Sequence, residues 1–394
     1  MTLLDIIQDL LLIPVAGGTV FCLLCVWAAA RFMSQPQAVG NYRPPITVLK
    51  PVYGLDKGLE ENLLSLCRQD YPDYQIVIGV QRTTDPALPL LRRLAQEFPD
   101  RITLVVKPSE PVVNGKVQNL VNALEHARHE ILIISDSDVR LAPDYLSAIV
   151  APLADGNVGY VCTLYRSAGA DHWFEKLELL SLNADFLPSL IFSAVTGVAD
   201  FCIGASVAFR ASDLKAIGGM AALGDYLVED HELGRRLVGL GKRLHLSPHI
   251  VEITADYPTF STWWHHQIYW DQNTWAANPV GFTLTILTRA VPFAVIYAAV
   301  RGFDMSGLTV LGTALAVRLI SAAIISARYL HDREGLGALW LLPLRDMLAL
   351  VSWYIALTRR TFVWRGHRFG LTKDGRIVPR DGAELPLTVK ATVP

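Results

Sequence analysis

The sequence predicts an α/β domain built on a doubly wound, mostly parallel sheet, with transmembrane α-helices at the N- and C-terminal ends of the chain. Between about residues 46 and 135, short apolar runs alternate with amphipathic segments, which is the strand–helix order of a parallel sheet. Apolar runs long enough to cross a bilayer lie before and after this region. The mean hydropathy of +0.32 and the 18% of charged residues are both unusual for a soluble enzyme.

The strands and helices of the α/β region follow one another regularly. Strands are predicted where short apolar runs occur, at residues 46–50, 74–81, 102–107 and 131–135. Amphipathic helices are predicted between them, at residues 58–69, 87–98 and 115–127. The run at 131–135 is almost wholly apolar, as in strands buried on both faces of a parallel sheet. Such sheets bind ligands beyond the carboxyl ends of their strands, so polar residues that follow a strand are the functional candidates.

Apolar segments flank this region. Leu10–Ala30 is predicted to be a retained anchor, because Asp5 and Asp9 stand where a signal peptide carries basic residues. Three further apolar stretches follow near residues 280–300, 305–328 and 336–358, and each carries charge. These charged residues are Arg289, Arg318 and the pair Arg345 and Asp346. A charge at the bilayer centre costs about 2.5–3.5 kcal/mol, so these helices must pack together, snorkel or lie at the interface.

The expected domains are an anchor at 1–34, an α/β domain at 35–279, transmembrane or interfacial helices at 280–360 and a cytoplasmic tail at 361–394. Arg31 and Arg43 follow the anchor, so the positive-inside rule places the α/β domain in the cytoplasm. The basic tail reads as cytoplasmic too, which requires an even number of spans after residue 280. Three apolar stretches conflict with this. Either one stretch is re-entrant or interfacial, or the tail breaks the rule.

Charge and cysteine content narrow the class of protein. The formal net charge is −2, from 35 basic and 37 acidic residues, so no basic surface for nucleic acid is indicated. The five cysteines are isolated in apolar surroundings and form no disulfide or zinc framework. They are expected to be buried thiols in a reducing compartment.

The strongest chemical signal is the pair Asp136 and Asp138, which directly follows the predicted strand 131–135. Two carboxylates at this point suit a Mg²⁺ or Mn²⁺ that also takes diphosphate oxygens. The metal would neutralise a leaving nucleoside diphosphate. The alternative is an Asx-rich turn or helix cap, since Pro143 and Asp144 follow soon after. The pair by itself leaves both interpretations open.

Two further residues follow strands and precede helices. Asp85 is predicted to cap a helix whose first residue is Pro86, and it can also contact the base or ribose of a nucleotide. Lys116 follows a flexible Asn114-Gly115 at a helix start, where a lysine can meet a phosphate. A solvated surface lysine is the ordinary alternative for Lys116.

The remaining signals lie later in the chain. Glu229 and Asp230 open a predicted helix, where acidic side chains interact favourably with the helix dipole. Asp230 can also act as a general base that removes the proton of an acceptor hydroxyl. The segment Trp263-Trp-His-His266-Gln-Ile-Tyr269-Trp270 is either an interfacial aromatic belt or the wall of a sugar or diphosphate site. No cysteine or carboxylate accompanies its histidines at metal-ligand spacing.

The order of these signals is more specific than any one of them. The chain resembles the ceramide-glucosyltransferase-like family of GT-A glycosyltransferases (families 21 and 2), over nearly its whole length. Within that family it looks most similar to the bacterial branch associated with hopanoid biosynthesis. The resemblance rests on a series of landmarks. They are Val48-Leu-Lys50-Pro51, Gly58-Leu-Glu-Glu-Asn62, Asp70-Tyr-Pro72, Asp85-Pro86, Lys116-Val-Gln-Asn119-Leu, Asp136-Ser-Asp138, Gly218-Gly219 and Glu229-Asp230.

The resemblance implies a role for each matched residue. The donor-binding residues would be Lys50, Asp85, Lys116, Asp136 and Asp138. Asp85 would contact uridine, and Asp136 and Asp138 would hold the divalent metal. Asp230 would be the general base of a single-displacement, inverting reaction. The closing motif, with His266, Tyr269 and Trp270, would bind acceptor or diphosphate. Tyr269 departs from the family, which has arginine there, and a hydroxyl replaces a charged forked donor. Arg82 also departs, because relatives often carry an acidic residue there.

The implied activity is transfer of N-acetylglucosamine or glucose from a UDP-sugar to a membrane lipid hydroxyl, with a hopanoid polyol as the acceptor. The implied location is a multi-pass position in the bacterial inner membrane. Ceramide glucosyltransferase is the alternative within the family. A catalytically weakened scaffold that binds nucleotide or lipid is the alternative outside it, and Tyr269 is its support. A transporter would leave the α/β region and its carboxylates unexplained.

Overall fold

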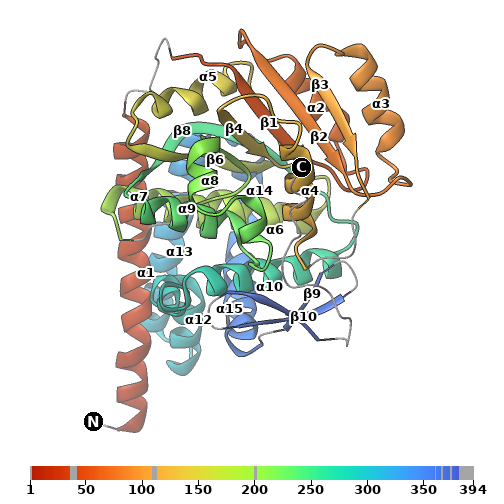
Figure 1. Cartoon of the computed structure of the whole chain (residues 1–394). Helices are drawn as coiled ribbons and strands as arrows, with labels where there is room; N and C mark the ends of the chain where they lie inside the picture. Colours follow the sequence, from red (N-terminus) through yellow and green to blue (C-terminus); the bar gives the residue numbers. More distant parts are fainter. Residues whose placement is uncertain are drawn as a thin grey trace. The chain divides into compact units, whose positions relative to one another are not determined.

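The computed structural model describes residues 2–35, 42–108, 113–198, 202–359, 361–364, 367–372 and 375–380. The chain forms two compact units (Figure 1). The first, here called the helical unit, contains Met1–Gln35, Arg166–Ala199 and Ala255–Arg360. The second, the sheet unit, contains Pro36–Tyr165, Asp200–Thr254 and Thr361–Pro394. Each unit therefore collects separate stretches of chain, whereas the sequence suggested contiguous domains.

The sheet unit is built on an eight-stranded sheet in the order β3-β2-β1-β4-β7-β6-β8-β5. Four strands form its parallel part, in which β1 pairs with β2 and β4, and β2 pairs with β3. The parallel strands are β1 (Ile46–Pro51), β2 (Tyr74–Val80), β3 (Ile102–Val106) and β4 (Ile131–Ser135). The other four are β5 (Val139–Arg140), β6 (Val158–Ala168), β7 (Ser206–Arg210) and β8 (Arg243–Thr254). The predicted α/β fold on a doubly wound, mostly parallel sheet is confirmed, with β1–β4 as the parallel strands, and the pairs β4–β7, β6–β7 and β5–β8 are antiparallel.

Helices of the sheet unit follow the predicted order. The chain buries Leu59, Leu63, Leu66 and Cys67 along one face of α2, at the helical spacing seen in the sequence. The helices are α2 (Leu59–Cys67), α3 (Leu88–Glu97), α4 (Gly115–Leu124), α5 (Tyr145–Val150), η1 (Ala151–Ala154), α8 (Ala211–Ala216), η3 (Met220–Leu223) and α9 (Glu229–Gly239). A second, antiparallel sheet contains β9 (Thr361–Trp364), β10 (His367–Leu371) and β11 (Ile377–Pro379). The expected tail at 361–394 thus contributes folded strands.

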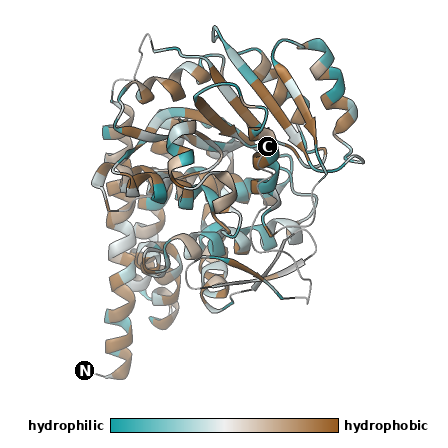
Figure 2. Cartoon of the chain, in the orientation of Figure 1, coloured by the Kyte–Doolittle hydropathy of each residue, from teal (hydrophilic) through white to brown (hydrophobic). Residues whose placement is uncertain are grey.

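The helical unit contains the apolar segments. Figure 2 shows apolar residues along most of α1, and exposed Leu10, Leu23 and Trp27 are among them. Its elements are α1 (Leu3–Met33), α6 (Trp173–Ser181), the π-helical turn η2 (Leu182–Phe186), α7 (Leu187–Thr196), α10 (Phe260–Ala277), α11 (Pro279–Leu284), η4 (Thr285–Thr288), α12 (Ala290–Val300), α13 (Met305–Ile324), the π-helical turn η5 (Ile325–Leu330), α14 (Arg333–Ala338), η6 (Leu339–Leu341) and α15 (Leu342–Thr358).

Four helices in the described chain are long and apolar enough to cross a membrane by length and composition. They are Leu3–Met33, Trp173–Thr196, Met305–Leu330 and Arg333–Thr358. The pair Pro279–Thr288 and Ala290–Val300, bent by 50°, makes a fifth if it is one span. The apolar helix at 173–196 was not foreseen. Its charged residues, including Glu178 and Asp185, interrupt the apolar run that marks a span in the sequence.

Candidate active site

Two of the predicted site residues, Lys116 and Asp136, form an ion pair in the sheet unit, and Glu229, which was not among the predicted site residues, binds the same lysine. Lys116 lies in the first turn of α4, after the N-cap Asn114. Its Nζ is 2.8 Å from Asp136 Oδ1 and 3.0 Å from Glu229 Oε1. Asp136 directly follows β4, and Glu229 is the first residue of α9. Burial alone would lower the pKa of Lys116, but the two carboxylates raise it well above its usual value. Lys116 is therefore a permanent cation at the carboxyl end of the parallel strands.

Asp230 lies beside this ion pair, as the second residue of α9. The main-chain N–H of His231 donates to Asp230 Oδ1 at 2.8 Å. Burial raises the pKa of Asp230 to about 7, with a further contribution from Glu229, and Lys116 opposes the rise. A carboxylate with a pKa near neutrality is suited to accept a proton and to release it again.

Gly204 fixes the position of Asp230 relative to Asp136. A Cβ on Gly204 would overlap Oδ2 of Asp230, so only glycine lets the main chain approach the carboxylate so closely. The adjacent Ala205 accepts a hydrogen bond through its carbonyl from the main-chain N–H of Asp136 at 3.1 Å. The segment 204–205 therefore lies against both aspartates. Sequence analysis missed Gly204, whose signal was a glycine shortly before a strand.

Asp138 supplies the second carboxylate of the pair. Its Oδ1 is buried and has no hydrogen-bond partner among the described residues. Burial, and then the nearby Asp136, raise the pKa of Asp138 to about 6. Burial raises the pKa of Asp136 as well. An unpaired buried carboxylate oxygen beside a second carboxylate fits a hard divalent cation.

No group of three or more His, Cys, Asp or Glu residues in the described chain could hold a metal alone. A cation bound between Asp136 and Asp138 would therefore need oxygen ligands from a diphosphate or water. This is the usual arrangement for Mg²⁺, which keeps few protein carboxylates and takes phosphate oxygens. The donor set thus fits the predicted site.

Lys50 lies beneath the site. It is fully buried on β1, and its Nζ donates to Ser135 Oγ at 3.1 Å and to the main-chain oxygen of Asp136. Burial lowers the pKa of Lys50 to about 8. Lys50 therefore holds the end of β4 through Ser135 and the main chain of Asp136. Lys116, in contrast, forms ion pairs with the carboxylates of Asp136 and Glu229.

Asp85 ties two loops together at the same edge of the sheet. Its carboxylate accepts hydrogen bonds from Gly54 N, at 3.0 Å to Oδ2, and from Ala87 N, at 2.9 Å to Oδ1. The helix α3 begins at Leu88 with Ala87 as its N-cap, so the expectation that Asp85 caps a helix beginning at Pro86 is corrected. Asp85 closes a turn before the helix, because its carboxylate bonds two residues ahead.

The C-terminal strand β11 reaches the loop that leads to Asp230. The main-chain N–H of Ile377 donates to Asp225 O at 2.9 Å, and that of Leu227 donates to Gly375 O at 3.2 Å. The guanidinium groups of Arg236 and Arg376 lie over the ring of Tyr226, at 5.5 and 5.3 Å from its centroid. Sequence analysis missed this contact because it joins residues about 150 positions apart.

Asn114 connects that loop to the ion pair. Its Nδ2 donates to Tyr226 O at 3.0 Å and to Glu229 Oε2 at 3.4 Å. The N-cap of α4 therefore binds both the loop and the start of α9. Sequence analysis named this asparagine only as a flexible residue before Lys116.

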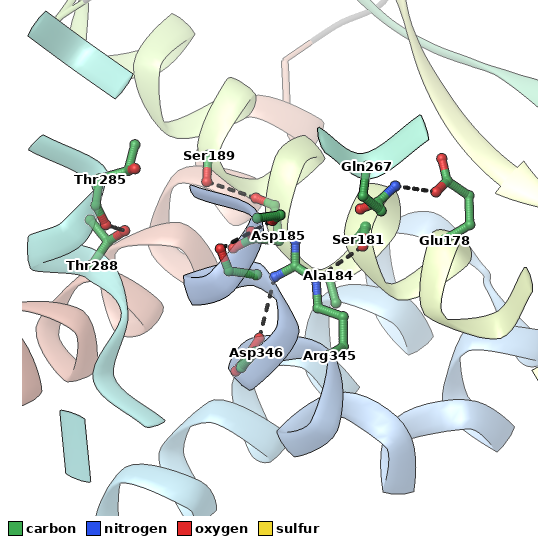
Figure 3. A network of polar contacts seen from close by, with 12 residues as sticks. Glu178, Ser181, Ala184, Asp185, Ser189, Gln267, Thr285, Thr288, Arg345 and Asp346 are labelled. Atoms are coloured by element: carbon green, nitrogen blue, oxygen red, sulfur yellow. Dashed lines mark hydrogen bonds and ion pairs between the residues drawn. The ribbon is translucent and has the colours of Figure 1, made fainter. Parts of the chain in front are cut away.

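The aromatic segment expected to bind acceptor lies on α10, in the helical unit. His266 Nδ1 is 2.8 Å from the Tyr257 hydroxyl and 3.7 Å from Glu178 Oε1. Glu178, buried on α6, also accepts from Trp263 Nε1 at 3.0 Å and from Gln267 Nε2, the latter drawn in Figure 3. Glu178 was missed, although a carboxylate in an apolar helix is itself a signal.

The other two motif residues are on the same helix. Trp270 stacks edge-on with Phe186 and lies near His266, with ring centroids 5.8 Å apart in both cases. Tyr269 is its neighbour in sequence and also makes contacts in the structure. His266, Tyr269 and Trp270 thus belong to a local group of the helical unit, as Asp85, Lys116, Asp136, Asp138 and Asp230 belong to the sheet unit.

A parallel sheet that ends in a lysine-bridged carboxylate site, together with several apolar helices, defines a membrane-associated glycosyltransferase of the GT-A type. The sequence model of "Glycosyl transferase family 21" matches residues 10–377, and the chain belongs to this family. The expected family and enzyme class are confirmed.

Named relatives and one solved structure agree with this assignment. "Ceramide glucosyltransferase 1" of Caenorhabditis elegans is 23% identical over 345 residues, which cover 85% of this chain and 73% of the relative. "Ceramide glucosyltransferase 3" of the same organism is 23% identical over 387 residues, covering 93% and 83%. The mannosyltransferase PcManGT from Pyrobaculum calidifontis, solved with GDP-Man and Mn²⁺, matches with a TM-score of 0.55 and 23% identity. That match covers 90% of this chain and 99% of the mannosyltransferase, and it supports the fold.

Proposed function

We propose that this glycosyltransferase transfers glucose or N-acetylglucosamine from a UDP-sugar to a hydroxyl of a membrane lipid, with inversion at the anomeric carbon. One observation carries the proposal. Asp230 combines a pKa of about 7 with a position beside the Lys116–Asp136 ion pair, so a proton acceptor and a diphosphate site are adjacent. The names of the relatives support a sugar and a lipid as the substrates.

In the proposed reaction, Asp230 accepts the proton of the lipid hydroxyl while the hydroxyl oxygen attacks the anomeric carbon. The bond between that carbon and the phosphate oxygen breaks, and UDP leaves with the electron pair. Lys116 offsets charge on the departing diphosphate. A Mg²⁺ or Mn²⁺ bound by Asp136 and Asp138 would supply Lewis-acid neutralisation of the same charge. Asp85 would lie near uridine, and Lys50 would keep Asp136 in place.

The proposed acceptor contacts are His266, Tyr269 and Trp270. Two acceptor classes have support. The Gly58-Leu-Glu-Glu-Asn62 segment and the His-led closing motif resemble the hopanoid branch, which favours a hopanoid polyol. The names of the relatives favour ceramide. We further propose a multi-pass location in a bacterial inner membrane with the sheet unit in the cytoplasm, because Arg31 and Arg43 follow the anchor.

A direct assay tests the proposal. Purified protein in nanodiscs is offered UDP-glucose or UDP-N-acetylglucosamine with ceramide or bacteriohopanetetrol, in the presence of Mg²⁺ or Mn²⁺. Glycosylated lipid detected by mass spectrometry is the expected result, and the productive pairing identifies donor and acceptor. Donor binding without product from any pairing would replace the enzyme with the scaffold alternative. Tyr269→Arg sharpens that result, because a large gain in rate would mean that tyrosine limits the natural site.

A further inference from the structure

The helical unit contains more apolar helices than the connectivity of the chain allows to cross a bilayer. The helix Trp173–Thr196 is preceded by β6 and followed by β7, which pair in one sheet. Both ends of this helix are therefore on the same side of the membrane. A return across hydrocarbon in the short stretch between Thr196 and Ser206 would leave extended backbone unpaired. The helix at 173–196 consequently does not cross.

The same reasoning applies to residues 255–360. This stretch begins after β8 and ends before β9, both of which belong to the sheet unit, so it crosses an even number of times. The turn between α12 and α13 lies by the N-terminal part of α1, where Arg301 Nη1 donates to Gln8 Oε1 at 3.2 Å. The turn after α13 lies by residues that directly follow β6, where Gly169 N donates to Glu334 Oε2 at 3.0 Å. Segments 279–300 and 305–330 therefore cross beside α1, and α14–α15 does not.

A recess of about 30 Å³ lies where the crossing helices meet the two apolar helices that do not cross. Arg289 lines it from the start of α12. Arg318 and Ser321 line it from the C-terminal half of α13, which leads to the turn before α14. The recess therefore lies in the half of the crossing helices that is nearer residues 169 and 334. The C-terminal half of α1 forms its apolar wall through Phe21, Cys22 and Cys25.

An ion-pair network forms the polar wall of the recess (Figure 3). Arg345 Nη2 is 2.6 Å from Asp185 Oδ2, and Arg345 Nε donates to Ser181 Oγ at 3.1 Å. Arg318 binds both carboxylate oxygens of Asp346, at 2.9 and 3.0 Å. The sequence placed Arg318, Arg345 and Asp346 in apolar stretches, and Asp185 from the unforeseen helix completes the set. With Arg289, the lining of the recess carries three arginines and two aspartates.

Two polar groups of the recess lining have hydrogen-bonding capacity that the described chain does not use fully. The Asp185 side chain is 37% exposed although helices surround it, and the π-helical turn η2 carries it. Such turns often mark functional positions. Arg289 Nε is buried and has no hydrogen-bond partner among the described residues. The recess therefore offers one acceptor and one donor.

The chemistry of this pair selects the ligand. A hydroxyl can donate to Asp185 and accept from Arg289, whereas a phosphate would bring its negative charge against the carboxylates of Asp185 and Asp346. A volume of about 30 Å³ admits one or two groups of the size of water. The fit is thus to neutral hydroxyl groups at the depth of lipid heads.

We propose that this recess binds non-reacting hydroxyl groups of the lipid acceptor's head, held between Asp185 and Arg289. This inference rests on the proposed lipid-directed activity. It adds a second recognition point, separate from the residues of the α10 motif. Water alone is the competing occupant.

Photo-crosslinking tests the proposal. Ceramide and bacteriohopanetetrol that carry a diazirine beside the head are each incorporated into nanodiscs with the full chain, without donor. Matched lipids have every head hydroxyl methylated. Mass spectrometry of crosslinked peptides should find label at residues 21–25 or 185–189 with at least one hydroxyl lipid. Label from the methylated counterpart should be about tenfold lower, as expected when hydrogen bonds to charged groups are lost. Equal labelling by a hydroxyl lipid and its methylated counterpart overturns the proposal. So does the absence of label at these residues with both hydroxyl lipids.

Variants separate the recess from general damage. Arg289→Gln and Asp185→Asn should each reduce recess labelling about tenfold, and Arg301→Gln, which alters the Arg301–Asp304 pair outside the recess lining, should not. UDP binding and thermal unfolding report on folding of each variant. Product formation without recess labelling would contradict this inference and leave the proposed function standing. Recess labelling without any product would contradict the proposed function and leave binding of lipid in the recess standing.

Discussion

Asp230 is the residue on which the proposed chemistry depends. Burial and then Glu229 raise the pKa of its carboxyl group to about 7, and the main-chain N–H of His231 donates a hydrogen bond to it. Asp230→Asn should lower kcat by about a thousandfold or more, because an amide cannot accept the hydroxyl proton. Binding of UDP, measured by calorimetry, should be retained. The matched control is Asp155→Asn, which removes an exposed carboxylate paired with Arg243. Normal turnover of Asp230→Asn would exclude it as the base.

The pH dependence follows from the same carboxyl group. Asp230 must be ionised to act as a base, so kcat/KM should fall as the pH drops below about 7. Glu229 contributes to the raised pKa, so Glu229→Gln should move this acidic limb to lower pH. Initial rates between pH 5 and 9 on both proteins make the comparison. An unmoved limb would mean that another group titrates.

The raised pKa also has a cost in stability, and its sign is determined. The folded chain holds the proton of Asp230 up to about pH 7, whereas the unfolded chain releases it near 3.8. Stability from this group is therefore lost as the pH rises from about 4 to 7. Asp230→Asn should raise the melting temperature at pH 8 more than at pH 5. A larger gain at pH 5 would contradict this account.

Gly204 sets the approach of the main chain to Asp230. Gly204→Ala should reduce kcat by at least about tenfold, because its methyl group displaces the carboxylate it would overlap. Gly156→Ala is the control, since nothing lies within 4 Å of a Cβ there. Steady-state kinetics on the two variants, with melting curves, separate a local displacement from loss of fold. Equal kinetics for both would show that the Asp230 site tolerates the shift.

At the level of elements, β11 holds the loop before α9. Ile377 of β11 bonds to Asp225, and Gly375, just before β11, bonds to Leu227. The guanidinium groups of Arg236 and Arg376 lie over Tyr226 in the same loop, which leads into Glu229 and Asp230. The family match also extends beyond the apolar helices, to residue 377.

Removal of residues 373–394 should therefore lower kcat about tenfold or more while UDP still binds. Tyr226→Leu should give a similar but smaller loss, because it removes the aromatic face under the arginines. Tyr226→Phe keeps that face and is the control. A truncated chain with unchanged kcat would show that the loop holds its position without the strand.

For the whole molecule, the topology that we infer has three crossings: α1, the bent pair 279–300, and 305–330. This topology would have the expected even number of spans after residue 280, with α14–α15 as the stretch that does not cross. In sealed cells, a membrane-impermeant maleimide should label Met305→Cys but not Lys215→Cys or Thr372→Cys. The five native thiols are buried. Labelling of Thr372→Cys together with Met305→Cys would mean that α15 crosses.

Local sequence patterns predicted the parallel strands, several candidate site residues and the apolar segments of this protein. Periodicity located β1, β2, β3 and β4 because each strand buries its own apolar run, and such runs need only local information. Asp136, Lys116 and Asp230 could be proposed as site residues because each follows a strand or opens a helix, and a local pattern reveals such positions. The long apolar segments on either side of the α/β region predicted a membrane protein, because the length of an apolar run is also local information.

Tertiary structure alone decided which of these residues meet. That Lys116 bridges Asp136 and Glu229, that Lys50 lies beneath the site, and that Asp185 joins Arg345 depend on distances between segments far apart in sequence. The same holds for the inferred number of crossings, because the inference rests on β7 and β9 belonging to the sheet unit and not on hydropathy. Local composition determines which segments form helices and strands, whereas pairing between distant strands determines where their ends and charges are placed.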